Sequence, residues 1–149
     1  MKGMTYFPRK GEAQAKWYVV DADSRILGRV ATQVATLLRG KHRADFTPFL
    51  DLGDHVIVVN AANVRLTGNK GEQKMYRHYT GYPGGLREIH ARKLLDQKPE
   101  SLIREAVQGM LPKNKLGKAL RRKLLVYAGQ EHPHQAQKPE VYSFPKSKS

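Results

Sequence analysis

Hydrophobic and polar positions change their period within the first forty residues. Residues 17–20 read Trp-Tyr-Val-Val, a short aromatic and β-branched run that predicts a strand. Apolar side chains then recur at helical spacing over residues 26–38, with arginines and other polar residues between them. Gly40 is placed to end this helix, and Asp23 or Ser24 is the expected N-cap.

A second extended run follows at residues 55–59, where four β-branched residues are contiguous after a histidine. Such a run is typical of a strand buried on both faces, as in parallel sheets. Strand, helix and strand together predict a right-handed βαβ unit and therefore an α/β fold. Residues 64–67 alternate apolar and polar, which is the pattern of a further short strand.

The second half of the chain gives weaker patterns. Residues 68–86 have no apolar period, which predicts either a long basic loop or an irregular hairpin. A short helix is expected over residues 89–95, and a clearer one over 99–110, with a proline in its first turn. A basic helix over residues 116–123 and a buried strand over 124–127 complete the expected elements.

These elements predict a single domain over residues 17–130. Residues 1–16 form an N-terminal extension without the apolar segment of a secretory signal. Residues 131–149 are polar and interrupted by prolines, so an extended C-terminal tail is expected. No run of 18 apolar residues is present, which excludes a membrane-spanning helix in the expected fold.

Charge changes this picture most. The 149 residues carry a net charge of +14, of which residues 1–61 contribute +3 and residues 62–149 contribute +11. An excess of this size repels itself, and a polyanionic partner neutralises it. A generic basic surface kept for solubility is the plainer alternative. Membrane binding is disfavoured because no long helix sets a basic face against a bulky apolar one.

An enzyme that binds a nucleotide on the βαβ unit is the second hypothesis. Phosphate binding at the first turn between strand and helix needs glycines, but residues 21–25 contain two aspartates and no glycine. The glycine-rich segments 68–71 and 81–85 lack the spacing of a P-loop. We therefore expect no catalytic residues, no cofactor and no small-molecule substrate.

A metal site is also not expected. The chain has no cysteine, and His132 and His134 have only Glu131 beside them as a further ligand. A turn around Pro133 is the preferred interpretation, with imidazoles that hydrogen-bond to RNA or to the backbone.

Basic residues interleaved with aromatic residues and glycines indicate RNA binding, because cations contact phosphates and rings stack on unpaired bases. Three patches have this character, although each could instead be a solvated face. The expected RNA-binding residues are Arg39, Lys41, His42 and Arg43 in the 39–43 patch, Lys70, Lys74, Tyr76, Arg77, His78 and Tyr82 in the 70–82 patch, and Lys113, Lys115, Lys118, Arg121 and Arg122 in the 113–122 patch.

Several motifs are also familiar. The run Gly-Met-Leu-Pro-Lys-Asn-Lys-Leu-Gly at 109–117 resembles a signature of large-subunit ribosomal protein family thirteen, in its bacterial or organellar type. The runs at 80–85 and 125–134 are similar to the same family. The matches extend in the expected order from about residue 17 to 139, whereas the termini follow no pattern that can be aligned.

The resemblance implies a three-layer α/β/α domain with a small, mostly parallel four-stranded sheet. It also implies a structural constituent of the cytoplasmic ribosome. Such a protein contacts large-subunit ribosomal RNA and neighbouring large-subunit proteins, and it joins the subunit early in assembly. Binding of messenger RNA with translational regulation is a secondary expectation. A free-standing RNA regulator that uses the same surfaces is the third hypothesis.

Overall fold

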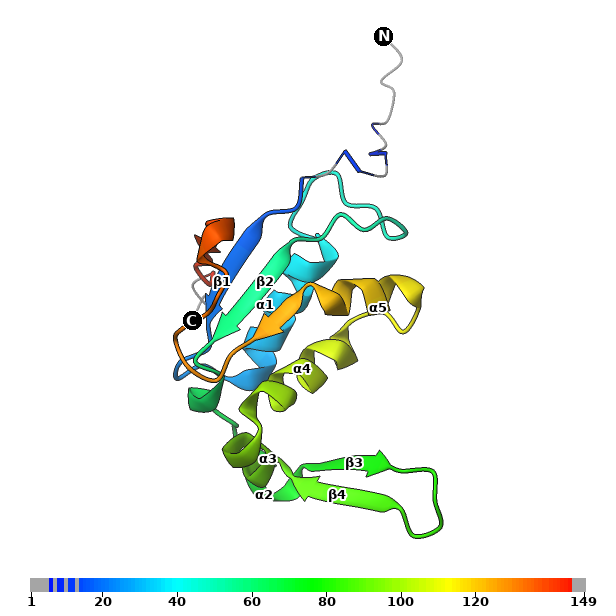
Figure 1. The fold of residues 1–149 in the computed structure, drawn as a ribbon, viewed down its shortest axis with the longest axis vertical. Helices are drawn as coiled ribbons and strands as arrows, with labels where there is room; N and C mark the ends of the chain where they lie inside the picture. The colour runs from blue at the N-terminus through cyan, green and yellow to red at the C-terminus, as the bar shows by residue number, and fades with distance from the viewer. Residues whose placement is uncertain (1–5, 7, 10, 13, 146–149) are drawn as a thin grey trace.

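A four-stranded parallel sheet lies at the centre of the computed structural model, which describes residues 6, 8–9, 11–12 and 14–145 (Figure 1). The strands lie in the order β5-β2-β1-β6, and all three pairings are parallel. Their bounds are Trp17–Asp21 for β1, His55–Val59 for β2, Leu124–Val126 for β5 and Glu140–Val141 for β6. The predicted α/β class and the small parallel sheet are confirmed.

Helices cover one face of this sheet. Helix α1 (Leu27–Arg39) connects β1 to β2, and α4 (Pro99–Met110) packs beside it. Helices α3 (Ala91–Gln97) and α5 (Lys115–Arg122) flank α4 along the chain. The core lies between these helices and the strands, where fully buried residues include Val20, Val34, Val58, Leu102 and Ile103.

The opposite face has a thinner cover, which the segment after β5 provides. Trp17 stacks on His55 with ring centroids 4.3 Å apart, and His134 stacks on the same indole at 5.6 Å. Tyr127 holds His134 through a hydrogen bond of 2.7 Å between its hydroxyl and Nε2. The cover of this face is therefore built from stacked and hydrogen-bonded side chains rather than from a helix.

The start of α1 differs from the prediction, whereas its end does not. Neither Asp23 nor Ser24 caps the helix, because the N-cap is Ile26 and makes no side-chain hydrogen bond. The Asp23 carboxylate instead accepts from the Asn63 amide at 2.8 Å. Gly40 ends the helix as predicted: its φ is +76°, and its N–H donates to the Leu37 carbonyl.

The middle of the chain is more ordered than the long loop that the sequence allowed. A short helix α2 (Lys70–Gln73) leads into the antiparallel strands β3 (Met75–Tyr79) and β4 (Leu86–His90), so the alternative of a hairpin is confirmed. The predicted helix over 89–95 begins only at residue 91, because Ile89 pairs with Tyr76 in the hairpin. The predicted strand over 64–67 is wrong: only an isolated bridge from Arg65 to Ile26 forms, beside the 3-10 turn Ala61–Asn63.

The C-terminal tail is not simply extended. It contains the 3-10 turn at 135–137 and then strand β6, which pairs with β1 at the edge of the sheet. The Tyr142 N–H donates to the Val19 carbonyl at 2.8 Å. Residues 146–149 of the expected tail and eight residues of the expected N-terminal extension lie outside the described residues.

The half-buried His55 predicts a pH dependence of stability. Burial lowers its pKa below the ordinary value of 6.5, and the Lys123 charge lowers it further. The unfolded chain therefore binds more protons than the folded one as the pH falls through about 6.5, so folding stability falls there. We expect a lower Tm at pH 5.5 than at pH 7.5 and a smaller drop in His55→Gln. Equal drops in both proteins, measured by thermal circular dichroism, would contradict this account.

Candidate nucleic-acid interface

The 70–82 patch lies on α2 and the hairpin that follows it. Lys70 begins α2, and Lys74 follows its last residue. Tyr76, Arg77 and His78 are in β3, of which the last two are exposed. The hairpin projects from the body of the domain beside α3 and α4 (Figure 1), so most of its side chains face solvent.

The loop at the end of the hairpin presents aromatic rings to solvent. The Gly85 N–H donates to the Tyr82 carbonyl at 2.9 Å, and a Cβ at position 85 would come within 2.0 Å of the Thr80 hydroxyl. This compact loop leaves Tyr82 75% exposed and Tyr79 61% exposed. Exposed rings on a fixed backbone are suited to stacking on unpaired bases.

The 113–122 patch lies on α5 and the turn before it. The Asn114 side chain accepts from the Gly117 N–H at 2.9 Å and so caps the helix. Leu120 is buried against the core, whereas the five expected cations of this patch are exposed. The helix therefore presents one apolar side to the domain and its charges to solvent.

These two patches meet across one cleft of about 660 Å³ between the hairpin, the end of α4 and the start of α5. Figure 1 shows the hairpin and α5 extending to the same side of α4. Arg77 and His78 line one wall, and Lys118 and Arg121 line the other. One acid, Glu105, is among the lining residues. The complete lining is Arg77, His78, Glu105, Gln108, Gly109, Leu111, Pro112, Lys113, Asn114, Gly117, Lys118 and Arg121.

Arg77 has an internal partner. Its Nε forms an ion pair with Glu88, the residue opposite it in the hairpin. The arginine side chain stays 64% exposed, so its remaining N–H groups are accessible from the cleft. Exposed ion pairs of this kind contribute little to stability, and the pair orients the guanidinium rather than holding the hairpin together.

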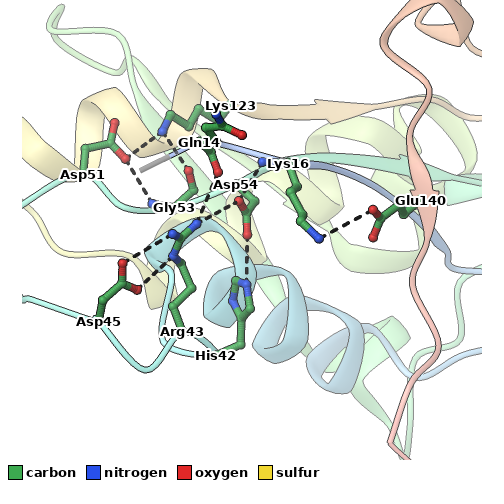
Figure 2. A network of polar contacts seen from close by, with 10 residues as sticks. All are labelled: Gln14, Lys16, His42, Arg43, Asp45, Asp51, Gly53, Asp54, Lys123 and Glu140. Atoms are coloured by element: carbon green, nitrogen blue, oxygen red, sulfur yellow. Dashed lines mark hydrogen bonds and ion pairs between the residues drawn. The ribbon is translucent and has the colours of Figure 1, made fainter. Parts of the chain in front are cut away.

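The 39–43 patch has a different character, because two of its members bind carboxylates of the protein itself (Figure 2). His42 Nε2 lies 2.9 Å from a carboxylate oxygen of Asp54, the one charged residue that is buried among the described residues. Arg43 donates to Asp45 at 3.0 Å, and this hydrogen bond raises the pKa of Arg43 and lowers that of Asp45. Arg43 also donates to the second Asp45 oxygen at 3.4 Å and to the Gln14 carbonyl at 3.3 Å.

The other two members of the 39–43 patch differ in exposure. The Arg39 guanidinium lies over the Phe46 ring at 5.8 Å, and its Nε is buried. Lys41 is exposed. Of the predicted RNA-binding residues, the structure brings Arg77, His78, Lys113, Lys118 and Arg121 together in the cleft. The remaining members of the 70–82 and 113–122 patches and the whole 39–43 patch lie outside its lining. Binding of RNA by each of the three patches stays a prediction.

Gln108 and Asn114, which also line the cleft, are not among the RNA-binding residues expected from the sequence. Gln108 carries no signal of its own, since it is a polar residue in a helix. Asn114 lies between two lysines within the motif at 109–117, and that position is the signal that could have identified it.

The histidines near the C-terminus hold the fold. His134 bonds to Tyr127, and His132 stacks against His134 with ring centroids 6.4 Å apart. Within the described part of the chain, no group of three or more His, Cys, Asp or Glu side chains is placed to hold a metal ion. None of the helices in that part is both long and apolar enough to cross a membrane.

A family model described as Ribosomal protein L13 matches residues 15–133, a range that includes the hairpin, α4 and α5. The large ribosomal subunit protein uL13 of Syntrophomonas wolfei is 58% identical over 137 residues, which cover 92% of this chain and 95% of the relative. Its namesakes in Geobacter sulfurreducens and Acaryochloris marina are 57% and 56% identical, with 92% and 93% of this chain and 96% and 92% of the relatives covered.

Proposed function

Because the chain belongs to the ribosomal protein L13 family, whose members are non-enzymatic components of the ribosome, we propose that it is a structural constituent of the large ribosomal subunit that holds ribosomal RNA in the cleft. The match includes every residue that lines the cleft. Neighbouring large-subunit proteins are the other partners, and the cytoplasmic ribosome is the place of action.

The single observation that supports RNA binding most is the convergence of two basic patches on one cleft. Arg77, Lys118 and Arg121 come from the hairpin and from α5, yet they line the same cavity. Cations on two facing walls attract a phosphate backbone more strongly than cations spread over a convex surface. The exposed ring of Tyr82 at the end of the hairpin adds a surface on which an unpaired base can stack.

The nucleotide-binding alternative finds no support at the turn that it requires. One oxygen of Asp21 accepts from the Asp23 N–H and from the Asn60 amide, at 2.9 Å and 2.8 Å. The Asp23 carboxylate binds Asn63. Two carboxylates fixed at the end of β1 repel a pyrophosphate at the position where a dinucleotide-binding fold receives it.

A role early in subunit assembly and a secondary role in binding messenger RNA follow from the same surface. A component that clamps folded RNA between a hairpin and a helix stabilises that RNA before later proteins join. Sedimentation separates the ribosomal role from that of a free regulator. Cofractionation with the large subunit supports the proposal, and an exclusively free pool contradicts it.

The salt dependence of RNA affinity tests whether the cleft binds RNA. K113Q/K118Q/R121Q removes three of the four Lys and Arg cations that line the cleft and leaves Arg77. The slope of log affinity against log salt should fall by about 0.7 to 0.9 for each lost phosphate contact. The matched control is R92Q/K93Q/K98Q, which removes the same charge from exposed positions on and after α3. Filter binding with a large-subunit RNA transcript measures both. Equal slopes in the two variants would contradict RNA binding in the cleft.

A further inference from the structure

A second basic groove lies on the other side of α4, at the start of α1. It has a volume of about 730 Å³, and three exposed arginines, Arg25, Arg29 and Arg65, line it. Its remaining lining residues are Ser24, Ile26, Val30, Thr32, Gln33, Phe144 and Pro145. No residue is shared with the cleft described above. We call this second cavity the arginine groove.

Main-chain contacts hold the arginines together although they are far apart in sequence. The Arg65 N–H donates to the Arg25 carbonyl at 2.8 Å, and the Arg65 carbonyl accepts from the Leu27 N–H at 3.0 Å. Arg29 lies in the first turn of α1. The Arg25 guanidinium carbon lies 3.9 Å from the centroid of the Phe144 ring, which orients it at the wall of the groove. The fold therefore fixes this cluster of like charges.

Among the residues that the structure describes, no carboxylate forms an ion pair with these arginines. None of the residues that line the arginine groove is acidic. Gln33 accepts from the Tyr142 hydroxyl with its amide oxygen, at 3.0 Å, so its amide nitrogen is left as a donor. Cations and donors without acids are the composition of an anion site.

The positive surface also continues beyond the groove. A smaller cavity of about 160 Å³ shares Ile26 and Arg65 with it and adds Lys70 and Lys74, again with no acid. Two adjoining cavities with five cations between them fit an extended polyanion better than a single small anion. Guanidinium groups also bind phosphate oxygens in bidentate pairs, so an RNA backbone fits better than an acidic peptide.

We propose that the arginine groove is a second RNA-binding surface, which takes the phosphate backbone of an RNA segment different from the one in the cleft. The inference rests on the proposed function, because that function supplies RNA as the partner. Met110 lines the smaller cavity, whereas Gln108 and Leu111 line the cleft, so the end of α4 separates the two surfaces. The protein then joins two RNA segments across one helix.

Footprinting of the full-length protein on a large-subunit RNA transcript tests this. The wild type should protect two RNA segments from hydroxyl-radical cleavage. R25Q/R29Q/R65Q should lose protection of one segment and keep the other, and its salt slope should fall by about 2 to 3. K113Q/K118Q/R121Q should show the reverse pattern. If R25Q/R29Q/R65Q has the same footprint and salt slope as the control R92Q/K93Q/K98Q, the inference is overturned. If the proposed function itself is wrong, the cleft variant K113Q/K118Q/R121Q also behaves like the control.

A second measurement does not depend on how well the triple variant folds. The chain has no cysteine, so a single introduced thiol carries a photo-crosslinker at one position. Thr32→Cys places it in the arginine groove and Gln108→Cys places it in the cleft. The two variants, assembled into large subunits, should crosslink to different RNA segments. A crosslink from position 32 to protein alone would show that an acidic protein occupies the groove, and it would overturn the inference.

Discussion

Gly117→Ala should lower the free energy of unfolding by about 3 kcal/mol. Gly117 is the third residue of α5, and a Cβ there would lie 1.7 Å from the Pro112 carbonyl oxygen. The obstacle is backbone, so no side-chain rotation relieves it. Either α5 moves away from the turn before it or the turn deforms, and both changes disturb the wall of the cleft. Urea denaturation measures the loss.

Gly109 provides the matched control. It lies in α4, and a Cβ at this position would meet nothing within 4 Å. Gly109→Ala should therefore stabilise the protein by about 0.5 to 1 kcal/mol, because alanine restricts the unfolded chain more than glycine does. If α5 undocks locally, amide hydrogen exchange in α5 accelerates. Unchanged unfolding together with unchanged exchange in Gly117→Ala would show that the close approach to Pro112 does not constrain the fold.

Removal of the Asp54 carboxylate should cost about 3 kcal/mol. Asp54 is 1% exposed, and it joins three segments of chain (Figure 2). It accepts from the Lys16 main-chain N–H at 2.8 Å, pairs with His42 at 2.9 Å, and lies 4.0 Å from an Arg43 nitrogen. Asp54→Ala leaves the Lys16 main-chain donor without its acceptor, removes the carboxylate beside the His42 imidazole and takes a buried counter-charge from Arg43. Chemical denaturation measures the cost.

Two substitutions calibrate this result. Asp54→Asn keeps an oxygen that accepts from Lys16 but removes the charge, so it should destabilise less than Asp54→Ala. Asp45→Ala removes the other carboxylate partner of Arg43, whose side chain is 24% exposed where that of Asp54 is 1% exposed. Solvent therefore screens this pair better, and the loss should be smaller than in either Asp54 variant. Equal losses for Asp54→Ala and Asp45→Ala would argue against a special role of the buried carboxylate.

Elements that pack against the core were predictable from the sequence, because their apolar residues follow the spacing of a helix or a buried strand. Helix α1 and strand β2 were predicted because helical spacing over 26–38 and a contiguous β-branched run over 55–59 both reflect burial in the core. Gly40 was predicted as a stop because a left-handed residue there needs no side chain. The cap was not predictable, since Asp23 binds Asn63, which lies 40 residues further along the chain.

The hairpin and strand β6 could not be predicted from the sequence, because most of their side chains are exposed. The hairpin projects from the domain, so Arg77, His78 and Tyr79 are all exposed and the strand shows no alternation. Strand β6 has only two residues, both exposed, and pairs through its main chain. Neither pattern of side chains could reveal these strands, because backbone hydrogen bonds and not apolar burial define them.

The candidate site was predictable in its residues but not in its geometry. The 70–82 and 113–122 patches were identified from charge and aromatic content, whereas their meeting across a cleft follows from how α4 carries the chain between them. The arginine groove was missed because Arg25 and Arg65 are brought together by main-chain hydrogen bonds across 40 residues. His42 and Arg43 were assigned by charge alone, which does not reveal the buried Asp54.

The parallel sheet can be completed only late in synthesis, because β6 lies near the C-terminus. One neighbour of β1 comes from residues 55–59, but the other comes only from residues 140–141. A nascent chain that has not yet emerged as far as residue 142 leaves the Val19 carbonyl without the N–H that it accepts from. During synthesis the outer side of β1 is therefore an open strand edge, able to pair with other chains until the last strand arrives.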